Sequence, residues 1–181
     1  FLPITTAIWR AHRAIACAAK KDFAGARREH EEFRRAKAAV PEQLMAITDP
    51  AHTILDVSDY FIAGEIALQE GRWDRAADLL EKGAEIEDSL SYGEPPQWLQ
   101  PVRHTLGAVY LMSDRYEDAE RVYREDLARW PNNGWSLFGL SRALEGQGRT
   151  AEAGEVRRQY DVAWAGADEP TETSCKCIPK T

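Results

Sequence analysis

The residues of this chain best suited to chemistry are two cysteines near its C-terminus. Cys175 and Cys177 are one residue apart in a polar stretch without periodicity, and a flexible tail is predicted for residues 168–181. Two thiolates at this spacing can share a soft metal or cycle as a redox pair, although two ligands do not close a tetrahedral zinc site. An inert tail is the simpler interpretation. Cys17 lies on an apolar helix face and is predicted to be a reduced core residue.

Four histidines are the other candidate ligands and bases: His12, His30, His52 and His104. They are isolated from one another, with no pair at the spacing of a helical metal site. The sequence also lacks a glycine-rich phosphate loop and a nucleophile elbow. It therefore argues against an enzyme and predicts no cofactor other than a soft metal at the two C-terminal cysteines.

The elements that carry these residues recur with a period of 34 residues. Leu106 to Ala119 can be laid over Leu140 to Ala153, with small residues where two helices approach and apolar residues at helical spacing. Pro131 ends the second helix of the first copy, because proline cannot donate the next backbone hydrogen bond. A fixed period of this length indicates a repeat protein, and such proteins more often bind than catalyse.

These residues at this spacing resemble the tetratricopeptide repeat (TPR), a helix-turn-helix unit of 34 residues. The resemblance implies an all-α fold, a right-handed α-α superhelix of about four helical hairpins over residues 1–167. The second hairpin aligns with the third at an offset of 43, with Gly64 opposite Gly107. Nine extra residues are therefore predicted between Ile86 and Trp98.

Local signals predict where individual helices begin. Asp49 and Pro50 supply an N-cap and a first-turn proline, so a helix is predicted from there to about Glu70. Asp114 and Glu117 have the spacing of a capping box, which predicts a helix start at this point. No alternating run of β-branched residues is long enough to predict a strand.

Composition is that of a single acidic domain. The 181 residues are 44% apolar and 29% charged, with a net charge of −7, which argues against a nucleic-acid backbone as the main ligand. No apolar run reaches the length of a membrane span. The chain opens on Phe1 to Ile4 without an initiator Met, so further hairpins are expected before it. A cytoplasmic location is favoured, and export is left open.

A narrower resemblance rests on four stretches: Glu87 to Trp98, Ala119 to Leu127, Pro131 to Leu140, and Ala163 with Trp164. They look like the C-terminal half of a largely uncharacterised family of microbial TPR proteins. The likeness covers most of the chain and implies no specific function. Histidine-rich hairpins of that family's preceding half are absent here, so no metal role is carried over from them.

The concave face of the array is the predicted binding surface. Fixed positions of the first helix in each TPR face that side, and this register gives the predicted groove: Phe61, Glu65, Gln69, His104, Met112, Trp135, Phe138 and Arg142. The surface lacks a cationic clamp for a terminal carboxylate, so an extended or helical peptide with apolar anchors is predicted. Packing between hairpins is an equal alternative for Phe61, Phe138 and Met112.

The insertion supplies a second group of candidates, the predicted insertion cluster: Glu87, Asp88, Tyr92, Glu94, Trp98 and Arg103. In a structural interpretation the loop packs over a hairpin junction, with Glu87 or Asp88 paired to Arg103. In a functional one it forms a wall of a pocket near Trp9, and a hydrolase would need Glu94 or His104 in a closed cavity. The structural interpretation is favoured because proline-rich loops with an aromatic residue usually pack.

Two functions of different classes follow. The first is a scaffold that binds a protein or peptide in its concave groove and assembles with further copies of itself. The second is a metal-handling or thiol-redox protein in which Cys175 and Cys177 are the reactive part and the repeats are a docking platform.

Overall fold

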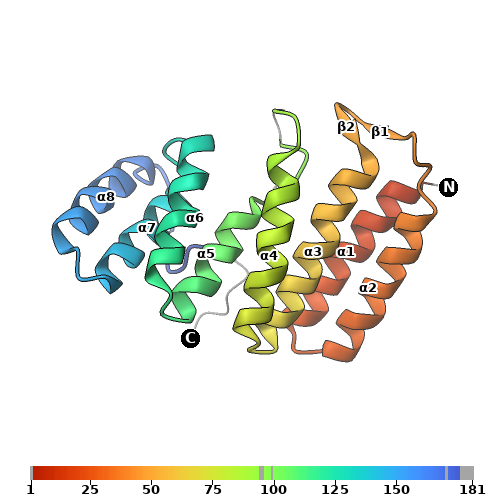
Figure 1. Cartoon of the computed structure of the whole chain (residues 1–181), viewed down its shortest axis with the longest axis horizontal. Helices are drawn as coiled ribbons and strands as arrows, with labels where there is room; N and C mark the ends of the chain where they lie inside the picture. The colour runs from red at the N-terminus through yellow and green to blue at the C-terminus, as the bar shows by residue number, and fades with distance from the viewer. Residues whose placement is uncertain (1, 94–95, 99, 170, 176–181) are drawn as a thin grey trace. The chain divides into compact units, whose positions relative to one another are not determined.

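The computed structural model of the chain describes residues 2–93, 96–98, 100–169 and 171–175. These residues contain eight α-helices, which pair along the sequence into four hairpins (Figure 1), and two strands of two residues each. The predicted all-α fold of four hairpins is confirmed. The chain divides into two compact units, Phe1–Val102 (unit 1) and Arg103–Thr181 (unit 2). None of the described helices is both long and apolar enough to cross a membrane.

Unit 1 is built around helix α3, which packs on the three other helices of the unit. The buried face of α1 consists almost entirely of alanines at helical spacing: Ala7, Ala11, Ala14 and Ala18. Short side chains let neighbouring helices approach closely, and larger residues such as Phe33 and Ile62 fill the remaining core. The half-buried thiol of Cys17 is free and packs against this core, as predicted. The helices of unit 1 are α1 (Pro3–Ala19), α2 (Phe23–Ala38), α3 (Ala51–Gln69) and α4 (Trp73–Asp88).

The connection between α2 and α3 contains a small antiparallel pair of strands, β1 (Met45–Ala46) and β2 (Asp49–Pro50). The strands are too short to show the two-residue alternation by which a sequence predicts strands. The predicted extent of α3 is confirmed, but the predicted cap is wrong. Pro50 is the N-cap residue and makes no side-chain hydrogen bond to the helix. The carboxylate of Asp49 accepts hydrogen bonds from Ser91 in the insertion.

Unit 2 is organised around Tyr123, a fully buried tyrosine of α6. Its ring contacts Gly107 on α5 and Gly139 on α7, two positions where a side chain would collide with the ring. Glycine at both positions therefore permits the close approach of the three helices. The helices of unit 2 are α5 (Val102–Met112), α6 (Tyr116–Arg129), α7 (Gly134–Gly146) and α8 (Thr150–Ala163).

The turns inside the four hairpins have the same geometry. Each contains one residue with positive φ two positions before its second helix: Lys21, Gly71, Asp114 and Gly148. In every turn the next residue donates its N–H to a carbonyl five residues earlier, at 2.9 Å. This is the long bond of the Schellman motif that ends helices. The same backbone solution therefore recurs at the positions that the sequence aligns as repeats.

This geometry overturns the predicted capping box at Asp114. With φ of 57°, Asp114 lies in the turn after α5 rather than at the cap of α6, whose N-cap residue is Arg115. The Asp114 carboxylate accepts the hydroxyl of Tyr116 at 2.5 Å. Spacing alone does not distinguish the last residue of a turn from a helix cap.

The insertion has the predicted length. Thirteen residues connect α4 to α5 and four connect α6 to α7, a difference of nine. The excess predicted from the repeat offset is therefore confirmed.

Candidate functional site

Half of the predicted groove residues are not accessible to a partner. Four are buried: Phe61, Glu65, Gln69 and His104. Trp98 of the insertion packs edge-on against Phe61, with ring centroids 5.4 Å apart. The amide oxygen of Gln69 accepts a hydrogen bond from Lys21 at 2.9 Å. These side chains serve packing, because a residue without exposed surface cannot meet a partner unless the structure rearranges.

The other four predicted groove residues lie in unit 2 and are accessible. Met112 and Arg142 are exposed, and Trp135 and Phe138 are half-buried. Arg142 is ion-paired with Glu145 on the next turn of α7, at 2.6 Å. The accessible part of the predicted groove is therefore carried by α5 and α7.

Tyr160 of α8 and Trp164, the C-cap residue of that helix, join Trp135 and Phe138 in a cluster. We call it the aromatic site: Trp135, Phe138, Tyr160 and Trp164. Trp135 meets Trp164 edge-on, with ring centroids 5.3 Å apart, and Trp164 stacks on Tyr160 with centroids 5.8 Å apart. The ring centroids of Phe138 and Tyr160 are 5.7 Å apart. The guanidinium of Arg157 sits over Tyr160 at 4.7 Å, where a cation is attracted to the face of the ring.

A shallow depression of about 310 Å³ lies beside the aromatic site. Its lining is Arg157, Tyr160, Asp161, Trp164, Ala167, Asp168 and Glu169. Three of these residues carry exposed carboxylates, and one of them, Asp161, is 3.3 Å from Arg157. The depression therefore combines an aromatic wall with an acidic rim.

Tyr160 and Trp164 are not among the predicted groove residues, because the groove register covers only the first helix of each hairpin. Their spacing of four residues, which brings side chains together on one helix face, was the available signal. Gly134 assists the arrangement, since a side chain there would meet the six-membered ring of Trp164 at 2.2 Å.

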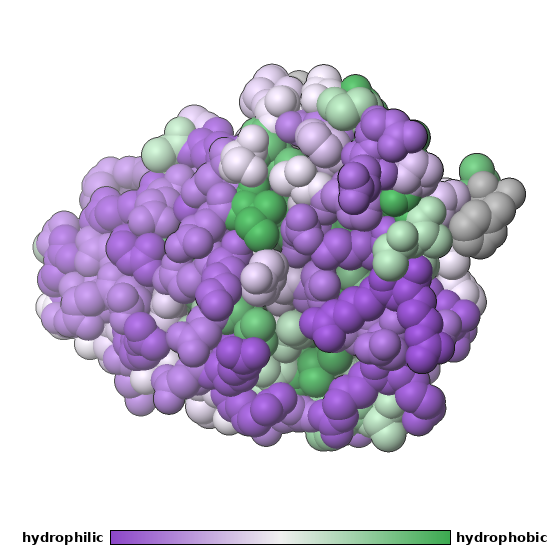
Figure 2. Space-filling view, turned by 45° about the vertical axis from the view of Figure 1, so that its right-hand side comes forward, coloured by the Kyte–Doolittle hydropathy of each residue, from purple (hydrophilic) through white to green (hydrophobic). Residues whose placement is uncertain are grey.

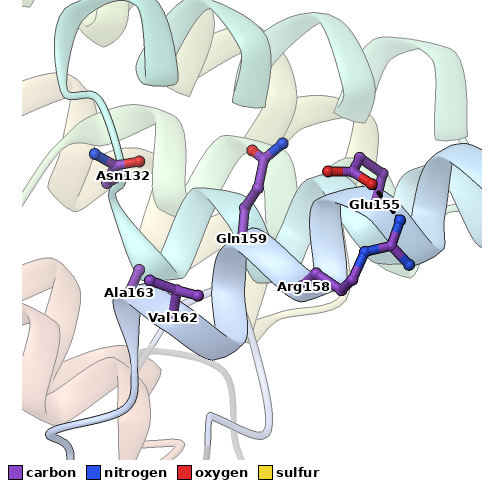
Figure 3. A pocket seen from close by; sticks show the side chains of 6 residues that line it. All are labelled: Asn132, Glu155, Arg158, Gln159, Val162 and Ala163. Carbon is purple, nitrogen blue, oxygen red and sulfur yellow. Dashed lines mark hydrogen bonds and ion pairs between the residues drawn. The ribbon is translucent and has the colours of Figure 1, made fainter.

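A second depression, of about 480 Å³, lies against another face of α8 (Figure 3). Asn132 contributes from the connection before α7, and the other lining residues come from α8: Glu155, Arg158, Gln159, Val162 and Ala163. Glu155 and Arg158 are paired with each other, and Val162 is 79% exposed. The polar side chains that line this depression are all exposed, so they do not favour one class of ligand over another.

The molecular face drawn in Figure 2 is mainly hydrophilic, with hydrophobic residues gathered in small separate patches. A partner of such a surface must satisfy polar groups as well as cover apolar ones. On this face, small apolar clusters are therefore better candidates for a binding site than a continuous apolar groove.

His104 belongs to a buried polar network of unit 2. Its Nε2 atom lies 3.3 Å from Asp126 Oδ2 and 3.0 Å from Asn133 Nδ2. The hydroxyl of Ser136 donates to the same Asp126 oxygen at 2.6 Å. The network therefore ties α5, α6 and α7 together.

A charged network joins α2 and α3 in unit 1. His30, Arg34 and Lys37 share one face of α2 and direct their nitrogens at Asp59 of α3, at 2.6, 2.9 and 3.4 Å. Lys37 also pairs with Asp56 at 2.5 Å. Burial alone would raise the pKa of Asp59, but hydrogen bonds from His30 and Arg34 outweigh it and lower the pKa from 3.8 to about 2.

The lowered pKa makes unit 1 sensitive to acid. Because the carboxylate of Asp59 is favoured in the folded state, its stabilisation is complete above pH 4 and is lost as the pH falls towards 2. We expect Asp59→Asn to lower the free energy of unfolding by about 2 kcal/mol at pH 7. Urea unfolding of the variant and the unaltered chain should converge between pH 4 and pH 2.

Asp56→Asn is the matched control, since Asp56 is more exposed and pairs with Lys37. We expect it to cost less than about 1 kcal/mol, as exposed ion pairs do. A deficit of Asp59→Asn that is unchanged between pH 7 and pH 2 would assign it to packing and not to charge.

The insertion packs onto unit 1 through Trp98, and the predicted pairing of Glu87 or Asp88 with Arg103 stays a prediction. Trp98 is buried, while Tyr92 is exposed. Glu87 accepts the backbone N–H of Val102 at 3.0 Å and so holds the first residue of α5. In unit 2, Arg103 pairs with Glu125 at 3.2 Å. Asp88 is the exposed last residue of α4, and Glu94 lies outside the described residues.

The C-terminal segment, which the sequence predicts to be flexible, is seated on unit 2 as far as residue 175. Thr171, Ser174 and Cys175 are buried. The Ser174 and Tyr123 hydroxyls are 2.5 Å apart, and Cys175 Sγ lies 3.2 Å from Thr105 Oγ1. Burial raises the pKa of Tyr123, so its hydroxyl keeps its proton and can donate.

Cys175 is disulfide-bonded, and Cys177 lies outside the described residues. Metal binding uses thiolates, so the soft-metal role would first require reduction of this disulfide, and it stays a prediction. Among the described residues, no three His, Cys, Asp or Glu side chains are grouped so that they could hold a metal ion.

Comparisons with known proteins agree with the architecture. A family model described as "Tetratricopeptide repeat" matches residues 60–82, 100–125 and 134–159, which fall in the second, third and fourth hairpins. No curated protein sequence matches the chain. A solved structure titled "Crystal structure of MamA protein" has a TM-score of 0.51 and 17% identity, covering 92% of this chain and 97% of that chain; identity this low supports the fold alone. The chain therefore contains tetratricopeptide repeats and has a TPR-like all-α solenoid fold.

Proposed function

We propose that the chain is a protein-interaction scaffold whose aromatic site binds a segment of its partner. Helical repeats are typical of proteins that bind other proteins through extended surfaces. The observation that carries the proposal is the grouping of Trp135, Phe138, Tyr160 and Trp164 beside a depression, with two of the rings half-buried on the predicted groove. Aromatic side chains are enriched among the residues that supply most binding energy at interfaces.

The rim of the site indicates the chemistry of the partner. Asp161, Asp168 and Glu169 place carboxylates around the aromatic wall, and the whole chain carries a net charge of −7. Complementary charge speeds association and excludes wrong partners. The proposed partner segment therefore has an apolar anchor with lysine or arginine beside it.

Selection of random peptides displayed on phage against the purified chain tests this function. We expect enrichment of sequences that combine an apolar anchor with basic residues. Asp168→Lys combined with Glu169→Lys should weaken binding of a selected peptide at least tenfold, because both substitutions reverse the charge of the rim. Isothermal titration of the synthetic peptide measures the change.

The matched control is Asp74→Lys combined with Asp78→Lys, which makes the same charge change at exposed positions of α4. It should leave the affinity within about twofold. Selection that enriches no peptide, or equal losses in the two double variants, would contradict the proposed function.

A further inference from the structure

The C-terminal segment of unit 2 is seated in a way that its composition does not explain. Residues 165–169 are exposed, yet Thr171, Ser174 and Cys175 are each less than one-tenth exposed. All three are small, and Thr171 and Ser174 are polar, so apolar burial contributes little to this docking. The segment is held by a few specific polar contacts.

The first of those contacts is made with the aromatic site, and the next two are made with other side chains of unit 2. The N–H of Thr171 donates to the hydroxyl of Tyr160, one of the four rings of the site, at 3.2 Å. Ser174 then meets the hydroxyl of Tyr123, and Cys175 meets Thr105 on α5. The hydroxyl of Tyr123 can reach Ser174 because Gly107 and Gly139 leave room for the tyrosine ring.

The fit of the segment is incomplete. The hydroxyl oxygen of Thr171 is buried and has no hydrogen-bond partner among the described residues. A buried polar atom without a partner carries the full cost of losing water, while each hydrogen bond that is made gives only a small net gain. The ordered backbone loses conformational entropy as well. A segment held in this way can be exchanged for one that pairs better.

We propose that the aromatic site and the surface that Thr171–Cys175 covers, formed by Thr105, Tyr123 and Tyr160, make one peptide-binding track, in which Thr171–Cys175 is an exchangeable intramolecular occupant. The inference rests on the proposed function and adds a competitor to it. The partner segment that replaces Thr171–Cys175 is extended and presents a small hydroxyl-bearing residue to Tyr123. Covalent attachment gives the chain's own segment a high effective concentration, so it weakens the binding of any outside peptide.

The test uses the full chain and a fluorescent peptide that copies residues 171–175 with serine in place of Cys175. Ser174→Glu puts a charge into the buried position and should expel the segment. Ala151→Glu is the matched control, because it adds the same charge at an exposed position that lines neither depression. We expect the probe to bind Ser174→Glu at least tenfold more tightly than Ala151→Glu or the unaltered chain, measured by fluorescence anisotropy.

Thr171→Pro gives a second route, since proline removes the N–H that reaches Tyr160. It should strengthen probe binding in the same way, with an unchanged circular dichroism spectrum. Equal binding of the probe to Ala151→Glu and to both expelling variants overturns the inference. The proposed function is judged separately, by whether phage-selected peptides lose affinity in the Asp168→Lys and Glu169→Lys double variant.

Discussion

Replacement of Gly139 by alanine should lower the free energy of unfolding by about 3 kcal/mol, the upper end of the usual range for an overpacked core. A Cβ atom at position 139 would lie 2.2 Å from Cζ of Tyr123. The ring cannot move away freely, because a Cβ built at Gly107 would also lie only 2.3 Å from the same atom. The two glycines enclose the ring, so α6 or α7 must shift. Urea unfolding followed by circular dichroism measures the loss.

Gly154→Ala is the matched control for this substitution. Gly154 lies within α8, and nothing would come within 4 Å of an added Cβ. We expect this variant to be more stable than the unaltered chain by about 0.5–1 kcal/mol, because alanine loses less backbone entropy in a helix. Combining Gly139→Ala with Tyr123→Leu tests the cause. If the alanine costs as much without the tyrosine ring as with it, the collision is not the reason for the loss.

The repeat period predicts one of these glycines and not the other. Gly107 occupies the small position that recurs in the TPR pattern, whereas the aligned position of the fourth hairpin is Ser141. Gly139 lies two residues before it, outside the pattern. A repeat period reflects the contacts that every copy makes. Gly139 instead contacts the ring of Tyr123, which belongs to the preceding hairpin, so the period carries no signal for it. Sequence periodicity therefore predicts the hairpins and their turns better than the junctions between particular copies.

Periodicity also does not show which of the predicted groove residues are accessible and which are buried. A helical register states which residues share a face, and Trp135 and Phe138 of α7 remain partly accessible in the structure. It cannot state what covers that face. Phe61 has the appropriate register but lies beneath Trp98. The docking of Thr171–Cys175 could not be predicted either, because hydroxyl contacts between distant residues leave no periodic signal.

The insertion should stabilise unit 1 mainly through one side chain, and Trp98→Ala is expected to cost about 3 kcal/mol. Trp98 is only 9% exposed and its ring meets Phe61 edge-on, so truncation removes a large buried ring and leaves a cavity. The loop is also tied to β2, where Asp49 accepts the N–H and the hydroxyl of Ser91. These hydrogen bonds restrict movement of the loop, so it cannot relax to fill the cavity that the truncation leaves. Urea unfolding at neutral pH gives the size of the loss.

Two further variants decide whether the lost ring is the cause. Tyr92→Ala truncates the exposed aromatic residue of the same loop and should change stability by less than about 0.5 kcal/mol. Trp98→Phe should cost less than about 1 kcal/mol. Phenylalanine keeps the contact with Phe61 and removes the indole N–H, which is buried without a hydrogen-bond partner among the described residues. Equal costs for Trp98→Phe and Trp98→Ala would contradict this assignment, because phenylalanine keeps an aromatic ring against Phe61 and alanine does not.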